Sequence, residues 1–246
     1  MKKFLFAGAL ALLVSCAGGK SDVEVITDFY KAVLGETEMT DGLLQESLSQ
    51  PVLDGLWEAD YADTYSYWAF RTGCQDGPSQ ESSLEDVKPL GDGWYQVTYS
   101  DLGIPGITDV RVEDGKICDY RPFSVPFELA HGYFLRNDVQ GDACPKKITN
   151  QEELLQYFGM AAVMGKNGEP TAIDFDKSFV IPVIYPDTDQ ETSIVVDRFW
   201  RTGPESLTLS VSSIVADEHL SFTIRPIQLL IVDSFYRDFT LDYHQD

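Results

Sequence analysis

The chain has 246 residues, of which 43% are hydrophobic, so it can form one large domain or two modest ones, each with its own core. It carries 18 lysines and arginines against 40 aspartates and glutamates, a formal net charge of −22 at pH 7. Nucleic acid and anionic lipid surfaces attract basic patches, so this balance argues against both as partners. The sequence contains no nucleophile elbow, phosphate-binding loop, dinucleotide fingerprint or zinc motif. We therefore expect neither catalysis nor a cofactor.

The first residues have the composition of an export signal. Two lysines precede an apolar run over residues 4–14, which is shorter than the ~20 residues that a membrane-spanning helix needs. The run ends in the sequence LVSC at residues 13–16, which resembles the lipobox of bacterial lipoproteins. In that family the cysteine thiol takes a diacylglycerol and the peptide bond before it is cut. The resemblance implies that residues 1–15 are a signal peptide and that Cys16 is lipidated.

The segment after the lipidated cysteine has the character of a tether. Residues 16–21 are small and polar, as in flexible linkers. Loss of the signal removes two lysines and leaves a net charge of −24. By resemblance to Gram-negative lipoproteins, Ala17 favours sorting to the outer membrane. We therefore expect an outer membrane lipoprotein on the periplasmic or cell-surface face, held to the membrane by its lipid anchor, with an envelope protein as a candidate partner.

Helical patterns follow the tether. Residues 22–35 place apolar side chains on one face at spacings of three and four, and Ser21 or Asp22 can cap the start. A second helical stretch covers residues 42–50 and is interrupted by Pro51.

An aromatic-rich stretch comes next and contains Trp57, Tyr61, Tyr65 and Trp68. These side chains could line a ligand pocket or form the bulk of a core. Aromatic residues dominate core burial, so we favour the core and keep the four residues as a candidate pocket.

Strand patterns then appear. Residues 87–90, 94–99, 107–112 and 117–120 are bounded by turn sequences, and most are rich in aromatic and β-branched residues. Polar and apolar residues alternate over residues 107–112, which predicts a half-buried strand. Residues 103–106 contain two glycines and a proline and are predicted to be a loop.

The helices, the aromatic stretch and the final hairpin with its Asp114-Gly115 turn resemble an uncharacterised family of bacterial α+β domains with a cone-shaped, nuclear-transport-factor-like fold. The resemblance covers roughly residues 22–121. It implies helices on a curved antiparallel sheet. This fold hosts both enzymes and binding modules, so the resemblance implies no activity.

Residues 122–147 are predicted to be a linker, and residues 148–246 a second, β-rich module. Thr149 and Asn150 are each followed three residues later by a glutamate, the signature of a capping box, and the helix is expected to continue to residue 164.

Five strand patterns follow, at residues 179–184, 192–200, 206–214, 222–226 and 227–232. Pro182 argues for an edge strand or a bulge, and the last pattern is almost entirely apolar, as in a strand buried on both faces. Hairpin-like spacing predicts a sandwich or a barrel. The fold class is therefore α+β, with N-terminal helices on a curved antiparallel sheet, then a β-sandwich or barrel with one leading helix.

The IDFxKxFVI run at residues 173–181 and the FTIRP step at residues 222–226 resemble the chagasin-like and protease-complex-inhibitor-like β-sandwich domains of bacterial envelope proteins. The resemblance covers about residues 148–236. Those inhibitors carry a glycine-rich loop between the first two long strands. The corresponding loop here, residues 187–191, has no glycine, so the inhibitory loop is missing or replaced.

Three cysteines follow Cys16, and an extracytoplasmic location permits disulfides. Cys74 and Cys118 lie in the same predicted module and are the first candidate pair, Cys118 with Cys144 is the second, and three free thiols are the alternative.

Asp187, Asp189 and Glu191 alternate and are a weak candidate for a calcium site, although the glycine that such loops prefer is absent. A solvated hairpin tip is the simpler interpretation, and we expect no metal site.

Three functional hypotheses follow. The favoured one is a lipid-anchored extracytoplasmic accessory or binding protein without catalytic activity. The second is a protease-inhibitor-like envelope protein. The third is a small-ligand-binding or enzymatic cone domain in the first module.

Overall fold

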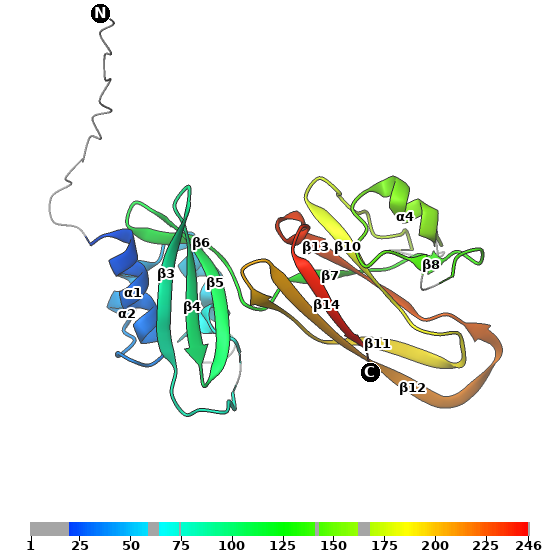
Figure 1. The fold of residues 1–246 in the computed structure, drawn as a ribbon, viewed down its shortest axis with the longest axis horizontal. Coiled ribbons are helices and arrows are strands. Elements are labelled where there is room, and N and C mark those ends of the chain that lie inside the picture. Colours follow the sequence, from blue (N-terminus) through cyan, green and yellow to red (C-terminus); the bar gives the residue numbers. More distant parts are fainter. Residues whose placement is uncertain (1–19, 59–63, 74, 141–142, 162–167, 246) are drawn as a thin grey trace, which may run out of the picture.

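The computed structural model describes residues 20–58, 64–73, 75–140, 143–161 and 168–245, which form two modules side by side (Figure 1). The N-terminal module packs helices against an antiparallel sheet, and the C-terminal module is largely β-structure. The predicted α+β class is therefore confirmed. Within the described ranges, no helix is both long enough and apolar enough to cross a membrane.

The N-terminal module begins with a helix that is capped as the sequence predicts. The Ser21 hydroxyl accepts from the Glu24 N–H, and the Glu24 carboxylate accepts from the Ser21 N–H at 2.7 Å. Pro51 lies in the first turn of a later helix, where its missing N–H costs no hydrogen bond, so the second helical stretch is split in two. The elements of this module are α1 (Asp22–Val33), α2 (Asp41–Ser47), α3 (Gln50–Leu56), β1 (Trp57–Glu58), β2 (Thr64–Tyr65), the 3-10 helix η1 (Tyr67–Phe70), β3 (Ser83–Gly91), β4 (Trp94–Asp101), β5 (Ile104–Glu113) and β6 (Lys116–Arg121).

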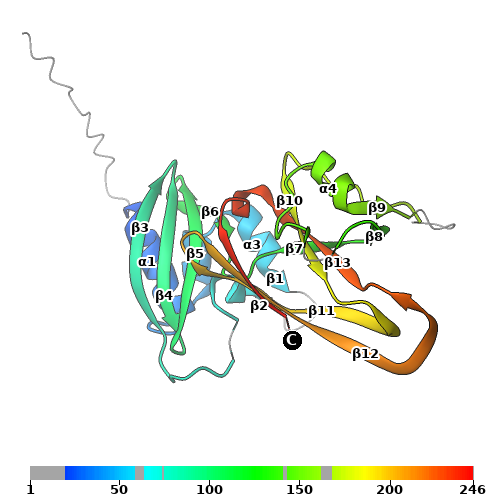
Figure 2. The ribbon, with the colours of Figure 1, turned by 45° about the vertical axis from the view of Figure 1, so that its right-hand side comes forward.

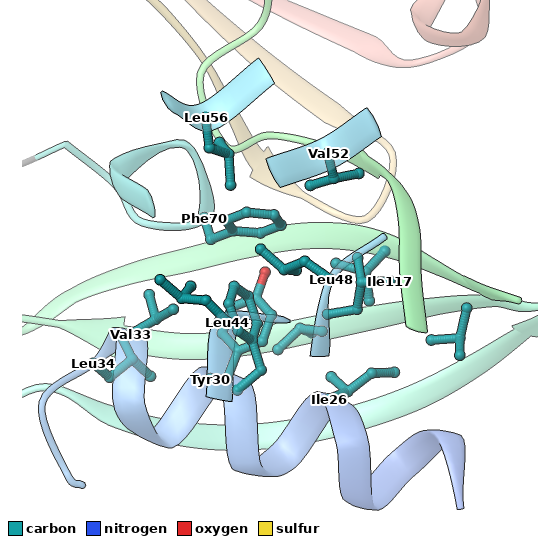
Figure 3. Close-up of a cluster of buried hydrophobic side chains, with 14 of the residues drawn as sticks. Ile26, Tyr30, Val33, Leu34, Leu44, Leu48, Val52, Leu56, Phe70 and Ile117 are labelled. Atoms are coloured by element: carbon teal, nitrogen blue, oxygen red, sulfur yellow. The ribbon is translucent and has the colours of Figure 1, made fainter. Parts of the chain in front are cut away.

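The helices cover one face of a four-stranded antiparallel sheet of order β3-β4-β5-β6 (Figure 2). Figure 3 shows the core between them, in which Tyr30 from α1, Phe70 from η1 and Ile117 from β6 come together. The Phe70 ring meets the Phe29 ring edge-on at 4.9 Å between centroids, an arrangement that stabilises beyond the buried area alone.

The turn between β4 and β5 corrects the predicted loop over residues 103–106. Leu102 and Gly103 have φ values of 53° and 83°, as in the two-residue turns that match the twist of paired strands. The strand therefore resumes at Ile104, and the loop is much shorter than predicted.

β6 contains an extra residue relative to β5. Ile117 pairs with Val112 and Asp119 pairs with Arg111, so Cys118 forms a bulge. The bulge reverses which side chains face the helices, and the last residues of β6 therefore present polar groups on the outer face of the sheet.

The C-terminal module is built from a long two-stranded ribbon that bends back on itself. β10 leads into β11 and β12 leads into β13, with the bend at residues 185–187 and 225–226. Arg225 forms a bidentate ion pair with Asp187 at the bend. The elements of this module are β7 (Phe127–Ala130), β8 (Tyr133–Leu135), α4 (Gln151–Tyr157), β9 (Phe158–Met160), β10 (Ser178–Ile184), β11 (Thr188–Gly203), β12 (Ser206–Ile224), β13 (Ile227–Asp233), the 3-10 helix η3 (Ser234–Tyr236) and β14 (Thr240–Gln245).

Folding of the ribbon stacks two three-stranded sheets, β10-β13-β7 and β11-β12-β14, around a shared core. The other face of β10-β13-β7 packs against α4 and the β8–β9 pair. Both faces of β13 are therefore covered, which confirms the prediction from its apolar sequence. Pro182 lies on β10, an edge strand, as predicted. None of the described sheets closes into a barrel, so the module is a sandwich.

Part of the range predicted as linker, residues 122–147, is structured. β7 pairs with β13, and just before it the Val125 N–H donates to the Phe199 carbonyl at 2.9 Å. The chain therefore joins the second module almost as soon as it leaves β6. The sequence of this range is rich in turn-forming residues, so its short strands were not predicted.

The leading helix of the second module ends earlier than residue 164. Asn150 caps it, as predicted, but Phe158–Met160 pairs with β8 as β9. A side chain at Gly159 would collide with the ring of Phe134, 2.3 Å from the position of its Cβ. The glycine thus permits a close strand contact in a stretch whose apolar spacing also fits a helix.

Two further differences concern the β-ribbon. The polar segment at residues 186–191 is mostly strand, because β11 begins at Thr188. Residues 222–224 of the pattern predicted at residues 222–226 belong to the long β12, and residues 225–226 form the bend. β14 runs parallel to β12 and was not predicted.

Candidate functional site

The aromatic residues proposed as a pocket lie largely at the surface. Trp57 and Trp68 are 44% and 50% exposed. Trp57 meets Tyr65 edge-on at 4.9 Å, and Trp68 carries the Arg71 guanidinium at 4.8 Å from its ring centroid. Tyr61 lies outside the described residues. Phe70 fills the core position of this stretch instead.

The cysteines of the described residues carry free thiols. Cys118 and Cys144 are both unpaired with another cysteine, so the predicted bridge to Cys118 is not formed in this structure, and Cys74 lies outside the described residues. Cys118 is the bulged residue of β6, and its sulfur lies 3.8 Å from a Glu113 carboxylate oxygen. Burial raises the pKa of the Cys144 thiol to about 12, so this thiol is protonated and unreactive at neutral pH. Cys16 also lies outside the described residues.

The three carboxylates proposed as a weak calcium site do not converge. Asp187 pairs with Arg225, and Asp189 pairs with His219 at 2.8 Å. Glu191 is exposed on β11. Across the part of the chain that the structure describes, no cluster of three or more acidic, histidine or cysteine side chains could hold a metal ion.

A more substantial site lies at the junction of the two modules. The end of the β11–β12 hairpin lies against the outer face of the N-terminal sheet at β5 (Figure 2). There Arg201 of β11 reaches Asp109 of β5, with 3.1 Å between Nη1 and Oδ2, and both side chains are buried. The alternation over residues 107–112 predicted a half-buried strand, in which the polar side of Asp109 would be the uncovered face. Asp109 faces the second module instead, so β5 is buried on both faces.

A pocket of about 310 Å³ opens beside this ion pair. Its walls come from both modules, since β4 and β6 supply one side and the end of β13 with η3 supplies the other. Pockets of this size at domain boundaries are the usual location of small-molecule sites. The lining residues are Trp94, Asp119, Tyr120, Arg121, Pro122, Pro126, Asp233, Phe235 and Tyr236.

Arg121 is the central side chain of this junction pocket. Its guanidinium carbon lies 3.8 Å from the ring centroid of Trp94 and 3.6 Å from that of Phe235, so one ring from each module holds it. Burial lowers the pKa of Arg121, while the nearby carboxylates of Asp109 and Asp119 act in the opposite direction. The group keeps its positive charge because an arginine does not lose its proton in proteins.

The edge donors of Arg121 remain available. Among the described residues, none of the ion pairs includes Arg121 and no side-chain hydrogen bond is donated by it. A guanidinium whose faces are covered and whose N–H groups are open is suited to planar, bidentate binding of a carboxylate or phosphate.

A neighbouring hollow of about 370 Å³ shares Pro126 and Asp233 with the junction pocket. Phe127 and Val232 line it together with exposed carboxylates, but it contains no cationic side chain. The junction pocket is therefore the site at which aromatic, cationic and anionic groups converge.

The sequence did not predict this site. Trp94 and Arg121 were visible as an aromatic residue at the start of one strand and a basic residue at the end of another. Their closeness follows from β4, β5 and β6 being neighbours, which the hairpin turns indicate. The contribution of Phe235, more than a hundred residues away, had no local signal.

Comparisons of the chain with models of protein families, with curated proteins and with solved structures found no match.

Proposed function

We propose that the chain is a non-catalytic binding lipoprotein, held at the outer membrane through Cys16, that takes a small ligand in the junction pocket. The observation that carries the binding role is the pocket of about 310 Å³ lined by both modules, with Arg121 held between two aromatic rings. The membrane location rests on the resemblance of residues 13–16 to a lipobox.

The docking of the modules supports a binding role for the pocket. The Asp109–Arg201 pair is buried between the modules, and the Arg201 N–H donates to the Phe123 carbonyl at 2.9 Å. These contacts hold the two walls of the pocket together, and a preformed site spends little free energy on ordering when a ligand binds.

The two alternative functions have less support. The inhibitor-like alternative needs residues 187–191 as a loop that inserts into a protease, but most of this segment belongs to strand β11 and pairs with β12. In the enzymatic alternative the first module would need an internal cavity, but Tyr30, Phe70 and Tyr99 pack ring against ring in its centre.

Metabolic labelling tests the anchored part of the proposal. The full chain would be expressed in a Gram-negative host with a clickable palmitate analogue. We expect the wild type to be labelled and to fractionate with the outer membrane, and Cys16→Ser to be unlabelled. Cys118→Ser is the matched control and should label like the wild type. A wild-type chain that is exported but carries no lipid would contradict the proposal.

A further inference from the structure

The charges around the junction pocket favour one class of ligand. Arg121 supplies a single positive charge, and Asp119 and Asp233 line the same pocket. Asp109 is nearby, but Arg201 neutralises it. The local balance is therefore one cation and two anions, which disfavours a simple anion such as acetate. None of the ion pairs of the described residues joins Arg121 to either carboxylate, so its N–H groups can accept an anionic group of a ligand.

The two pocket carboxylates have free acceptor capacity. One oxygen of Asp119 accepts from the Tyr120 N–H at 2.8 Å, and one oxygen of Asp233 accepts from the Phe235 N–H at 2.7 Å. Both side chains are exposed, and a carboxylate has room for further donors on its second oxygen. An ammonium group, with three donors, matches such acceptors.

We propose that the junction pocket binds a small zwitterion, with its carboxylate or phosphate on Arg121 and its ammonium group at Asp119 and Asp233. The volume of about 310 Å³ is at the lower end of small-molecule sites, which suits a molecule the size of an amino acid or of a phosphoethanolamine headgroup. Both sources share the chemistry of an anion and an ammonium group a few bonds apart. The inference rests on the proposed function, since it assigns a ligand class to the same pocket.

Calorimetric titration of the mature protein tests the ligand class. The probes are the twenty protein amino acids and glycerophosphoethanolamine, each compared with singly charged analogues, so that alanine is matched by propionate and by ethylamine. We expect at least one zwitterion to bind about tenfold or more tightly than both of its analogues. Binding confined to amino acids identifies a free metabolite as the source, and binding confined to glycerophosphoethanolamine identifies a headgroup.

Variants locate the binding. Arg121→Met should weaken the zwitterion about 10- to 100-fold, the usual effect of losing a charge-assisted hydrogen-bonding partner. Arg198→Met is the matched control, because Arg198 also lies over an aromatic ring, 4.7 Å from the centroid of Trp200, but does not line the pocket. Asp119→Asn, at an exposed position, should weaken the zwitterion and leave propionate binding unchanged or stronger, and it keeps the test valid if Arg121→Met folds poorly.

Three results would overturn the inference: no zwitterion binds, every zwitterion that binds is matched in affinity by one of its singly charged analogues, or neither Arg121→Met nor Asp119→Asn alters zwitterion binding. Failure of the inference can be told from failure of the proposed function. If a broader panel of neutral or anionic compounds raises the melting temperature of the wild type but not of Arg121→Met, the pocket is a binding site with another ligand class. If nothing binds and Cys16 carries no lipid, the proposed function fails as well.

Discussion

Two aspartates of the N-terminal sheet are buried, and their surroundings satisfy them very differently. Asp101 accepts hydrogen bonds from the Arg71 guanidinium, from the Thr72 N–H at 3.0 Å and from the Thr72 hydroxyl at 2.9 Å. Asp109 faces the second module and pairs with Arg201, but its Oδ1 has no hydrogen-bond partner among the described residues. One carboxylate is fully coordinated within its own module, and the other depends on a group from across the junction.

The different surroundings of Asp101 and Asp109 indicate different roles, one in the stability of a module and the other in the docking of the two modules. A buried charge with several donors stabilises the module that contains it, whereas a sparsely bonded buried pair adds little net free energy because desolvation offsets the attraction. Such a pair is costly to break, since one charge is then buried alone. We infer that Asp101 stabilises the N-terminal module and that Asp109–Arg201 fixes how the two modules dock.

Removal of one partner of the junction pair should have the largest effect. Arg201→Met leaves Asp109 buried without a counter-charge, and we expect the free energy of unfolding to fall by about 4 kcal/mol. Urea denaturation of the mature chain measures this loss. A loss below about 1 kcal/mol would show that the junction opens to water and does not bury the pair.

The double variant Asp109→Leu/Arg201→Met sharpens this test. An apolar pair of similar volume is often neutral or stabilising in place of a buried ion pair, so most of the lost stability should return. If the double variant is as unstable as Arg201→Met, the pair contributes net stability and the contrast with Asp101 is wrong.

Asp101→Asn should cost about 3 kcal/mol, because Arg71 loses its counter-charge in a largely buried position. Burial raises the pKa of Asp101, but hydrogen bonds from Arg71 and Thr72 outweigh it and bring the pKa below its usual value. The contribution of the carboxylate is therefore complete above the unfolded pKa of about 3.9 and is lost as the pH falls through the folded value.

Urea denaturation at several pH values checks both parts of this prediction. The difference between wild type and Asp101→Asn should be constant from pH 7 to about pH 5 and shrink below about pH 4. A difference that stays unchanged at the lowest pH at which both proteins fold would rule out an ionised Asp101 as its source.

The helix cap should contribute less than either buried carboxylate. Ser21→Ala removes the hydroxyl that accepts from the Glu24 N–H at the start of α1, with an expected loss of about 1 kcal/mol. Thermal denaturation followed by circular dichroism measures it. Ser193→Ala, at an exposed strand position, is the control and should stay within about 0.5 kcal/mol of the wild type.

The ion pair at the bend of the ribbon should have the smallest effect. Asp187→Asn breaks the bidentate contact with Arg225, but both side chains are partly exposed, at 49% and 29%. We expect a loss of at most about 1 kcal/mol that decreases further in 1 M salt. A larger loss that salt does not reduce would indicate that the bend depends on this pair.

The sequence allowed the local features to be predicted where local physics determines them. The helix start at Ser21 and the apolar run of β13 were predicted from local patterns and are present in the structure. The bulge at Cys118 and the parallel partner β14 depend on distant pairing, and the sequence contains no local signal for either.

The candidate site was not predictable for a related reason. Alternation along β5 shows which face is apolar and which is polar. It does not show whether the polar face contacts water or a second module. The sequence therefore indicated no role for Asp109 or Arg121. The candidate pocket was predicted around Trp57 and Trp68, whereas the observed pocket is lined by Trp94.

Differential scanning calorimetry of the mature chain tests most directly whether the two modules form one body around the junction pocket. We expect a single unfolding transition in which the calorimetric and van't Hoff enthalpies agree. A wild-type chain that unfolds in two independent steps would show that the walls of the pocket belong to modules that do not stabilise each other, and that the two modules do not form one body.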